Sequence, residues 1–100
     1  MKRLIKIMDI VGSTITNAGG YQLYVVLSES IKNQEVVDLS MEKATPLSSS
    51  FLNSSFGQLI EDFGYSAVKK YVGLSCVKKS DAERIKNYIT SLLLILDKER

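Results

Sequence analysis

Residues 45–64, TPLSSSFLNSSFGQLIEDFG, decide the fold that this sequence predicts. Pro46 disfavours helical backbone in the residue before it, so a loop leads into the stretch. The serines that follow can accept hydrogen bonds from the unpaired amides of a first helical turn. One stripe at helical spacing then holds Phe51, Leu52, Ser55, Phe56, Leu59, Ile60 and Phe63. The pattern predicts a buried helix that ends at Gly64, where a left-handed C-terminal cap is expected.

The composition limits what this chain can be. Its 100 residues are 45% apolar and 24% charged, which allows one core but no second folded unit, so we expect a single domain over residues 1–100. The net charge of +2 comes from dispersed lysines, which argues against a nucleic-acid surface. The single cysteine, Cys76, cannot form an intramolecular disulfide and fits a reducing compartment. Neither a signal sequence nor a membrane-length apolar run is evident, so we expect a cytoplasmic, soluble protein without a membrane partner.

Upstream of the decisive stretch, the pattern predicts two strands and a helix. Residues 2–11 are rich in Leu, Ile and Val and precede a turn cluster, which indicates a strand. Residues 12–20 are glycine-rich but match no common phosphate-binding pattern, so a plain loop is favoured. The length and apolar stripe of residues 21–32 predict a helix, although residues 21–27 also suit a short strand. Residues 35–41 are typical of a central parallel strand.

Downstream of the decisive stretch, the pattern predicts a third strand and a final helix. Residues 67–75 alternate in part and are predicted as a strand whose lysines guard an exposed edge. Ser80-Asp81-Ala82-Glu83 has the pattern of a capping box and predicts where the final helix begins. The resulting order predicts an α/β domain with a mixed or mostly parallel sheet of about three to four strands on about three helices.

The final helix has more apolar surface than one core-facing stripe requires. Residues 92–96 are apolar all round, and Leu93, Leu94 and Ile95 cannot all point inward. Two interpretations remain open: a helix sunk between the core and its loops, or a patch for a partner or for self-association. We therefore place Leu93 and Leu94 among the candidate partner-binding residues, and a homodimer remains an alternative.

Three motifs between residues 36 and 64 carry a resemblance to a known family. A strand contains an Asp-Leu step, a helix starts with Ser-Phe-Leu-Asn, and a Phe-Gly pair lies within that helix. The matching residues are Asp38, Leu39, Ser50, Phe51, Leu52, Asn53, Phe56 and Gly57. In these motifs the chain resembles the STAS-like family of bacterial proteins of unknown function, related to the STAS domain of sulfate transporters and anti-sigma factor antagonists. The resemblance implies a compact, layered α/β regulatory domain.

The resemblance also implies a protein partner. In the antagonists that partner is an ATP-binding serine kinase of the histidine-kinase-like class, and it phosphorylates a serine at the start of this helix. The position that matches best is Ser49, with Ser48 and Ser50 as its neighbours. The antagonists have Asp-Ser-Ser-Gly at this turn, whereas this chain has Leu47-Ser48-Ser49-Ser50. Simple capping by serine is therefore the competing interpretation.

The favoured function is a non-enzymatic regulatory module that binds its partner through the loop and the helix start. The predicted contact residues there are Thr45, Leu47, Ser50 and Asn53. The alternative is a small-molecule or phosphate-binding domain that uses residues 12–20 and the helix start near Ser49. An enzyme centred on Asp38 or Cys76 ranks last, because without histidine no nucleophile and base are visible. Asp38 is expected to accept backbone hydrogen bonds from the loop after its strand. No cofactor or metal is predicted.

Overall fold

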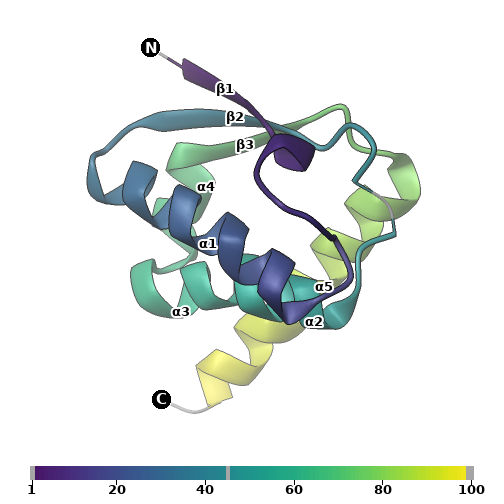
Figure 1. Cartoon of the computed structure of the whole chain (residues 1–100). Coiled ribbons are helices and arrows are strands. Elements are labelled where there is room, and N and C mark those ends of the chain that lie inside the picture. The colour runs from purple at the N-terminus through teal and green to yellow at the C-terminus, as the bar shows by residue number, and fades with distance from the viewer. Residues whose placement is uncertain (1, 45, 99–100) are drawn as a thin grey trace.

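Strands and helices alternate along the chain, as Figure 1 shows. The computed structural model describes residues 2–44 and 46–98. The elements are β1 (Lys2–Lys6), a 3-10 turn η1 (Ile7–Asp9), α1 (Asn17–Lys32), β2 (Val36–Ser40), α2 (Ser49–Leu52), η2 (Asn53–Gly57), α3 (Gln58–Phe63), α4 (Tyr65–Tyr71), β3 (Val72–Ser75) and α5 (Lys79–Lys98).

The three strands form one parallel sheet in the order β1-β2-β3. Ile5 lies opposite Leu39, which lies opposite Leu74. The predicted α/β class is confirmed, and β2 is the central strand, as its mostly apolar sequence predicts. The helices lie on one side of the sheet in Figure 1. The core fills the space between these layers and is built around Leu23, Leu27, Val37, Leu39, Phe51 and Leu59.

The segments α2, η2 and α3 form one continuous helix, which we call the central helix. Backbone angles stay helical through both junctions, at Asn53 and at Gln58. Its middle is a π-helical turn, a feature often found at functional sites. There the buried Ser55 hydroxyl donates to the carbonyl oxygen of Phe51 at 2.7 Å. Gly64 ends the helix with a positive φ of 87°, but its ψ of 151° lies outside the predicted left-handed helical region.

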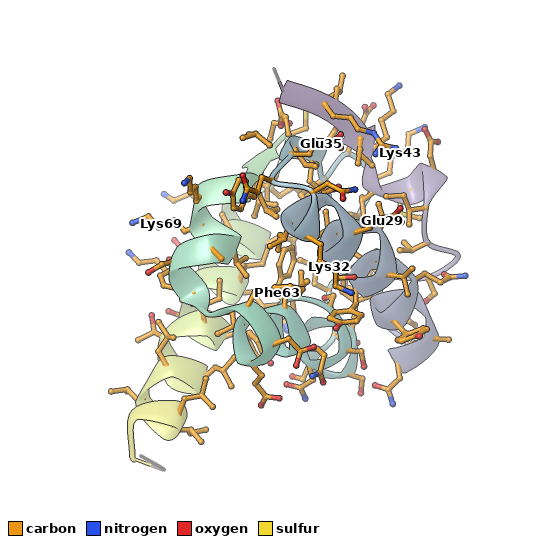
Figure 2. All side chains as sticks on the ribbon, turned by 90° about the vertical axis from the view of Figure 1, so that its left-hand side faces the viewer. Glu29, Lys32, Glu35, Lys43, Phe63 and Lys69 are labelled. Carbon is orange, nitrogen blue, oxygen red and sulfur yellow. The ribbon has the colours of Figure 1, made fainter. Side chains whose placement is uncertain are left out.

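The prediction of a strand over residues 67–75 is wrong for its first part, because α4 extends through Tyr71 and only Val72–Ser75 is a strand. On a strand, adjacent side chains point to opposite faces, so Lys69 or Lys70 would face the core. On α4 both lysines are exposed while Val68 is buried. Figure 2 shows Lys69 pointing away from the molecule and Phe63 in the space between α1 and the following helices. The two lysines therefore belong to the helix before β3 and not to the strand itself.

Three other predicted boundaries also shift. The first strand ends at Lys6, because the carbonyl of the buried Ile7 accepts the Ile10 and Val11 amides in a turn. The predicted helix over residues 21–32 is confirmed but begins at Asn17, so part of the predicted glycine loop is helical. The final helix begins at Lys79, and Ser80 is therefore inside it rather than at its N-cap. The Ala82 amide already donates to the Lys78 carbonyl at 2.8 Å.

Candidate functional site

The start of the central helix is capped as the sequence predicts. The Ser48 backbone is extended, and its hydroxyl oxygen accepts a hydrogen bond from the Phe51 amide at 3.0 Å. Phe51 is fully buried and Leu47 is only 1% exposed. Leu47 therefore belongs to the core, and its side chain presents almost no surface for the partner contact that the sequence predicts. Thr45 lies outside the described residues.

The loop before α1 lies against the loop before the central helix. The Thr14 hydroxyl donates to the Pro46 carbonyl at 2.6 Å, and the Ser48 amide donates to the Thr14 carbonyl at 3.2 Å. Ile15, whose side chain is 54% exposed, directly follows Thr14, so its backbone lies close to that of Ser48, just before the first turn of α2. We call Ile15, Pro46, Ser49 and Ser50 the helix-start surface. The one available sequence signal for Ile15 was an isoleucine within a polar turn.

The three candidate serines have different environments. Ser48 is half-buried, and its hydroxyl is engaged in the cap. Ser49 and Ser50 are the first two residues of α2, and both are exposed. Two of the three serines are therefore open to solvent. Modification of Ser48 would instead remove the cap. The structure thus separates the three serines, which the sequence left as neighbours in a run.

Asn53 and Gly57 connect the central helix to α5. The exposed Asn53 side chain accepts a hydrogen bond from the Tyr88 hydroxyl at 2.6 Å. A Cβ atom on Gly57 would lie 2.2 Å from the Tyr88 oxygen, so the glycine makes room for this contact. Burial and, secondarily, the nearby Glu61 raise the pKa of Tyr88, so its hydroxyl remains a donor. Asn53 therefore has a structural partner, and only its remaining polar atoms can serve another protein.

The glycines of residues 12–20 do not form an anion nest. The Gly12 amide donates to the Gln22 side chain at 3.1 Å, and the Gly19 amide donates to the Thr16 hydroxyl at 3.0 Å. The Gly20 amide donates to the Thr16 carbonyl at 3.1 Å. Gly20 permits close helix packing instead, because a Cβ there would lie 2.6 Å from the Phe51 carbonyl oxygen. These amides are satisfied internally and are unavailable to a phosphate.

The residues considered for catalysis do not form a reactive cluster. Asp38 is half-buried in β2 and lines a shallow recess beside Lys69 and Lys70. The predicted hydrogen bonds to Asp38 from its following loop are not present among the described residues. Cys76 is exposed, and its φ of 53° is unusual for a residue other than glycine. Residues 2–44 and 46–98 contain no group of three potential metal ligands.

An apolar groove of about 620 Å³ lies between α5 and the junction of α3 with α4. Ile60, Tyr65, Leu93 and Leu96 contribute to its lining. Leu94 also lines it but is 61% exposed, and the neighbouring Ile95 is exposed as well. Figures 1 and 2 show the C-terminal end of α5 extending beyond the other helices. Leu93 and Leu94, the two predicted partner-binding residues of this helix, therefore differ in exposure. Leu93 is half-buried in the groove, and Leu94 is mostly open to solvent.

These features define a small parallel α/β domain with an exposed serine pair at the start of a buried helix. A family model described as a STAS-like domain of unknown function matches residues 22–74, more than half of the chain. The chain belongs to this family, which confirms the predicted resemblance. The match begins within α1, covers β2, the central helix and α4, and ends within β3. Searches of curated proteins and of solved structures returned no match. Across the described part of the chain, no helix has the length and apolar character required to cross a bilayer.

Proposed function

We propose that this chain is a non-enzymatic regulatory module that binds a protein partner through the helix-start surface. The main supporting observation is the pair of exposed serines at the start of α2, with Ser48 engaged in the cap and the exposed Ile15 in the loop that pairs with the residues before them. An exposed aliphatic side chain provides apolar contact area, and hydroxyl groups around it provide hydrogen bonds at a polar rim. Membership of a STAS-like family is consistent with this role.

The proposed switch is phosphorylation of Ser49 by an ATP-binding kinase partner. Ser49 is the first residue of α2, where helix amides favour an added anion. A phosphoserine carries about two negative charges, and the four residues of the helix-start surface are all uncharged. Phosphorylation would therefore replace a neutral contact with a strongly hydrated anion. A partner that covers this surface would have to remove water from the phosphate, and the cost of that desolvation would release it.

We further infer that the apolar groove beside α5 joins two copies of the chain. Residues 87–96 have no charged side chain, and Leu94 and Ile95 are exposed there. This region provides both a protruding apolar helix end and a groove next to it. A two-fold symmetric contact requires a surface that is complementary to itself. In the proposed dimer, the exposed end of α5 in each copy packs into the groove of the other copy.

The test of the kinase switch uses affinity-tagged wild type, Ser49→Ala and Ser49→Asp, recovered from native cells and analysed by intact mass. Ser80→Asp is the matched control, because Ser80 is also an exposed serine in the first turn of a helix. We expect one ATP-binding protein to copurify with wild type, Ser49→Ala and Ser80→Asp but not with Ser49→Asp. A phosphate-sized mass increment should appear on wild type and disappear in Ser49→Ala. Equal recovery of the same partner by all four forms would overturn the proposal.

A further inference from the structure

A second recess, on the opposite flank of the central helix from α5, lies between α1 and the η2–α3 segment. It has a volume of about 480 Å³, and its polar and aromatic lining comes from Asn17, Tyr21, Tyr24, Ser54, Gln58 and Asp62. Ala18 also lines it, and among the described residues of the lining Asp62 is the only one with a charged side chain. The Ser54 hydroxyl donates to the Asn17 side chain at 3.2 Å and connects the two walls. The recess is thus a polar site with one negative charge in a chain of net charge +2.

The Asp62 carboxylate is held in place by two donors from different elements. The Tyr24 hydroxyl donates to Oδ2 at 2.5 Å, and the Gln58 side chain donates to Oδ1 at 3.0 Å. The hydrogen bond to Asp62 is the main cause that raises the pKa of Tyr24, so the phenol remains a donor near neutral pH. An ionised carboxylate accepts about four hydrogen bonds, and each oxygen therefore retains acceptor capacity. Both oxygens can accept from one ligand without losing their present partners.

The tyrosines provide an aromatic surface next to this carboxylate. The rings of Tyr21 and Tyr24 are stacked, with centroids 6.1 Å apart and an angle of 26° between their planes. Tyr21 is 62% exposed, so one aromatic wall of the recess is open to solvent. Aromatic ring faces attract cations, and guanidinium groups also stack on them through their planar shape.

We propose that this recess binds the guanidinium group of an arginine on a partner protein. A guanidinium matches the site in two ways: its parallel N–H groups can donate to both oxygens of Asp62, and its plane can stack on Tyr21. An ammonium group offers only a point charge, and an anion would be repelled by Asp62. The seven lining residues include no basic side chain, so the α-carboxylate of free arginine would have no counter-charge there. An arginine within a peptide chain is therefore the better fit.

This proposal does not depend on Ser49 or on the helix-start surface, so the two can fail separately. The competing explanation is that Tyr24, Gln58 and Asp62 only connect α1 to α3. In that case the carboxylate would contribute to folding and would show no preference among cationic ligands. The two explanations predict different ligand responses, and these can be measured without knowing the partner.

The experiment is an NMR titration of the full chain with N-acetyl-arginine amide, followed by backbone amides and tyrosine ring signals. Free arginine tests a small-molecule source, N-acetyl-lysine amide tests a point charge, and N-acetyl-citrulline amide tests a neutral analogue of the same shape. We expect saturable shifts at the recess for N-acetyl-arginine amide, weaker binding of lysine amide and free arginine, and none for citrulline amide. Tighter binding of free arginine would overturn the assignment to a partner protein.

Matched variants complete the test. Asp62→Asn should weaken arginine-amide binding by about tenfold, because a charge-assisted pair of hydrogen bonds is lost. Tyr21→Ala should weaken it by about threefold through loss of the aromatic surface. Glu61→Gln removes the same charge from the adjacent exposed position outside the recess, and it should leave the dissociation constant unchanged. If Asp62→Asn fails to fold, Tyr21→Ala still tests the proposal, because the Tyr21 ring is mostly exposed and its removal should not prevent folding. Equal losses in Asp62→Asn and Glu61→Gln, or equal responses to arginine and citrulline amides, would overturn the proposal.

Discussion

The central helix and α5 both contain dense apolar sequence, but the fold buries them to very different extents. In the central helix, buried residues occur from Phe51 to Ile60, and contacts come from α1 on one side and α5 on the other. In α5, Ile85 is buried, whereas no later residue through Leu96 reaches full burial. The apolar content of a helix therefore limits how much surface it can bury. Its position between the layers determines how much of that surface is actually buried. The surplus on α5 is what remains available for association.

The largest difference in stability between the two helices is expected when one side chain is truncated in each. Phe51→Ala should destabilise the protein by about 3–5 kcal/mol, because a fully buried aromatic ring leaves a cavity. Ile95→Ala, at an exposed α5 position, should change stability by less than about 0.5 kcal/mol in the monomer. Urea unfolding followed by circular dichroism, at concentrations low enough to keep the chain monomeric, measures both. Similar losses in the two variants would mean that α5 is buried as deeply as the central helix.

A smaller effect is expected where α1 crosses the central helix. Gly20→Ala should cost about 1–3 kcal/mol, because its Cβ would lie 2.6 Å from the Phe51 carbonyl oxygen and 2.7 Å from the Ser54 Cβ. This strain outweighs the gain of about 1 kcal/mol that alanine brings to a helix interior. Gly12→Ala is the control, since nothing lies within 4 Å of its added Cβ. The urea midpoints of the two variants report the difference, and an unchanged midpoint in Gly20→Ala would contradict the close crossing.

The two serine-led helix starts give a further contrast of about 1 kcal/mol. Ser48→Ala removes the hydroxyl that accepts from the Phe51 amide and should cost about 1 kcal/mol. Ser80→Ala should cost little, because α5 begins at Lys79 and the Ser80 side chain is exposed. Equilibrium unfolding of both variants, under the same buffer and temperature, provides the measurement. A loss at Ser80 as large as that at Ser48 would support the capping box that the sequence predicts.

Local signals explain which parts of the fold could be predicted from the sequence. Pro46, the serine run and the apolar spacing after it lie within one stretch, so the sequence predicts the central helix and a serine cap, and the structure identifies Ser48 as that cap. Residues 67–71 alternate only in part, so their sequence is a weak signal for a strand. As a helix, this segment buries Val68 and leaves Lys69 and Lys70 exposed. The sequence has a serine motif before each of two apolar runs. Only the structure shows that Ser48 caps its helix and that Ser80 lies inside the first turn of α5.

The candidate sites divide in the same way. Ser49 is a candidate because the resemblance matches it to the serine that is phosphorylated in the antagonists, and Ser50 is its neighbour in the serine run. Ile15 was missed because its position near Ser49 depends on hydrogen bonds between two loops distant in sequence. The Tyr24–Asp62 pair was missed for the same reason, since α1 and α3 meet only after the central helix packs. No local pattern in either segment indicates that contact.

The last contrast concerns association rather than folding. Leu94→Glu should leave the free energy of unfolding within about 0.5 kcal/mol of wild type in the monomer, because this side chain is 61% exposed. In a self-associated form, the same glutamate would be buried against the apolar groove without a partner charge, which is strongly unfavourable. Sedimentation velocity should therefore show a concentration-dependent dimer for wild type and a monomer for Leu94→Glu. Glu83→Gln, at an exposed position near the start of α5, is the control and should dimerise like wild type. A wild-type chain that stays monomeric at all concentrations would contradict the proposed dimer.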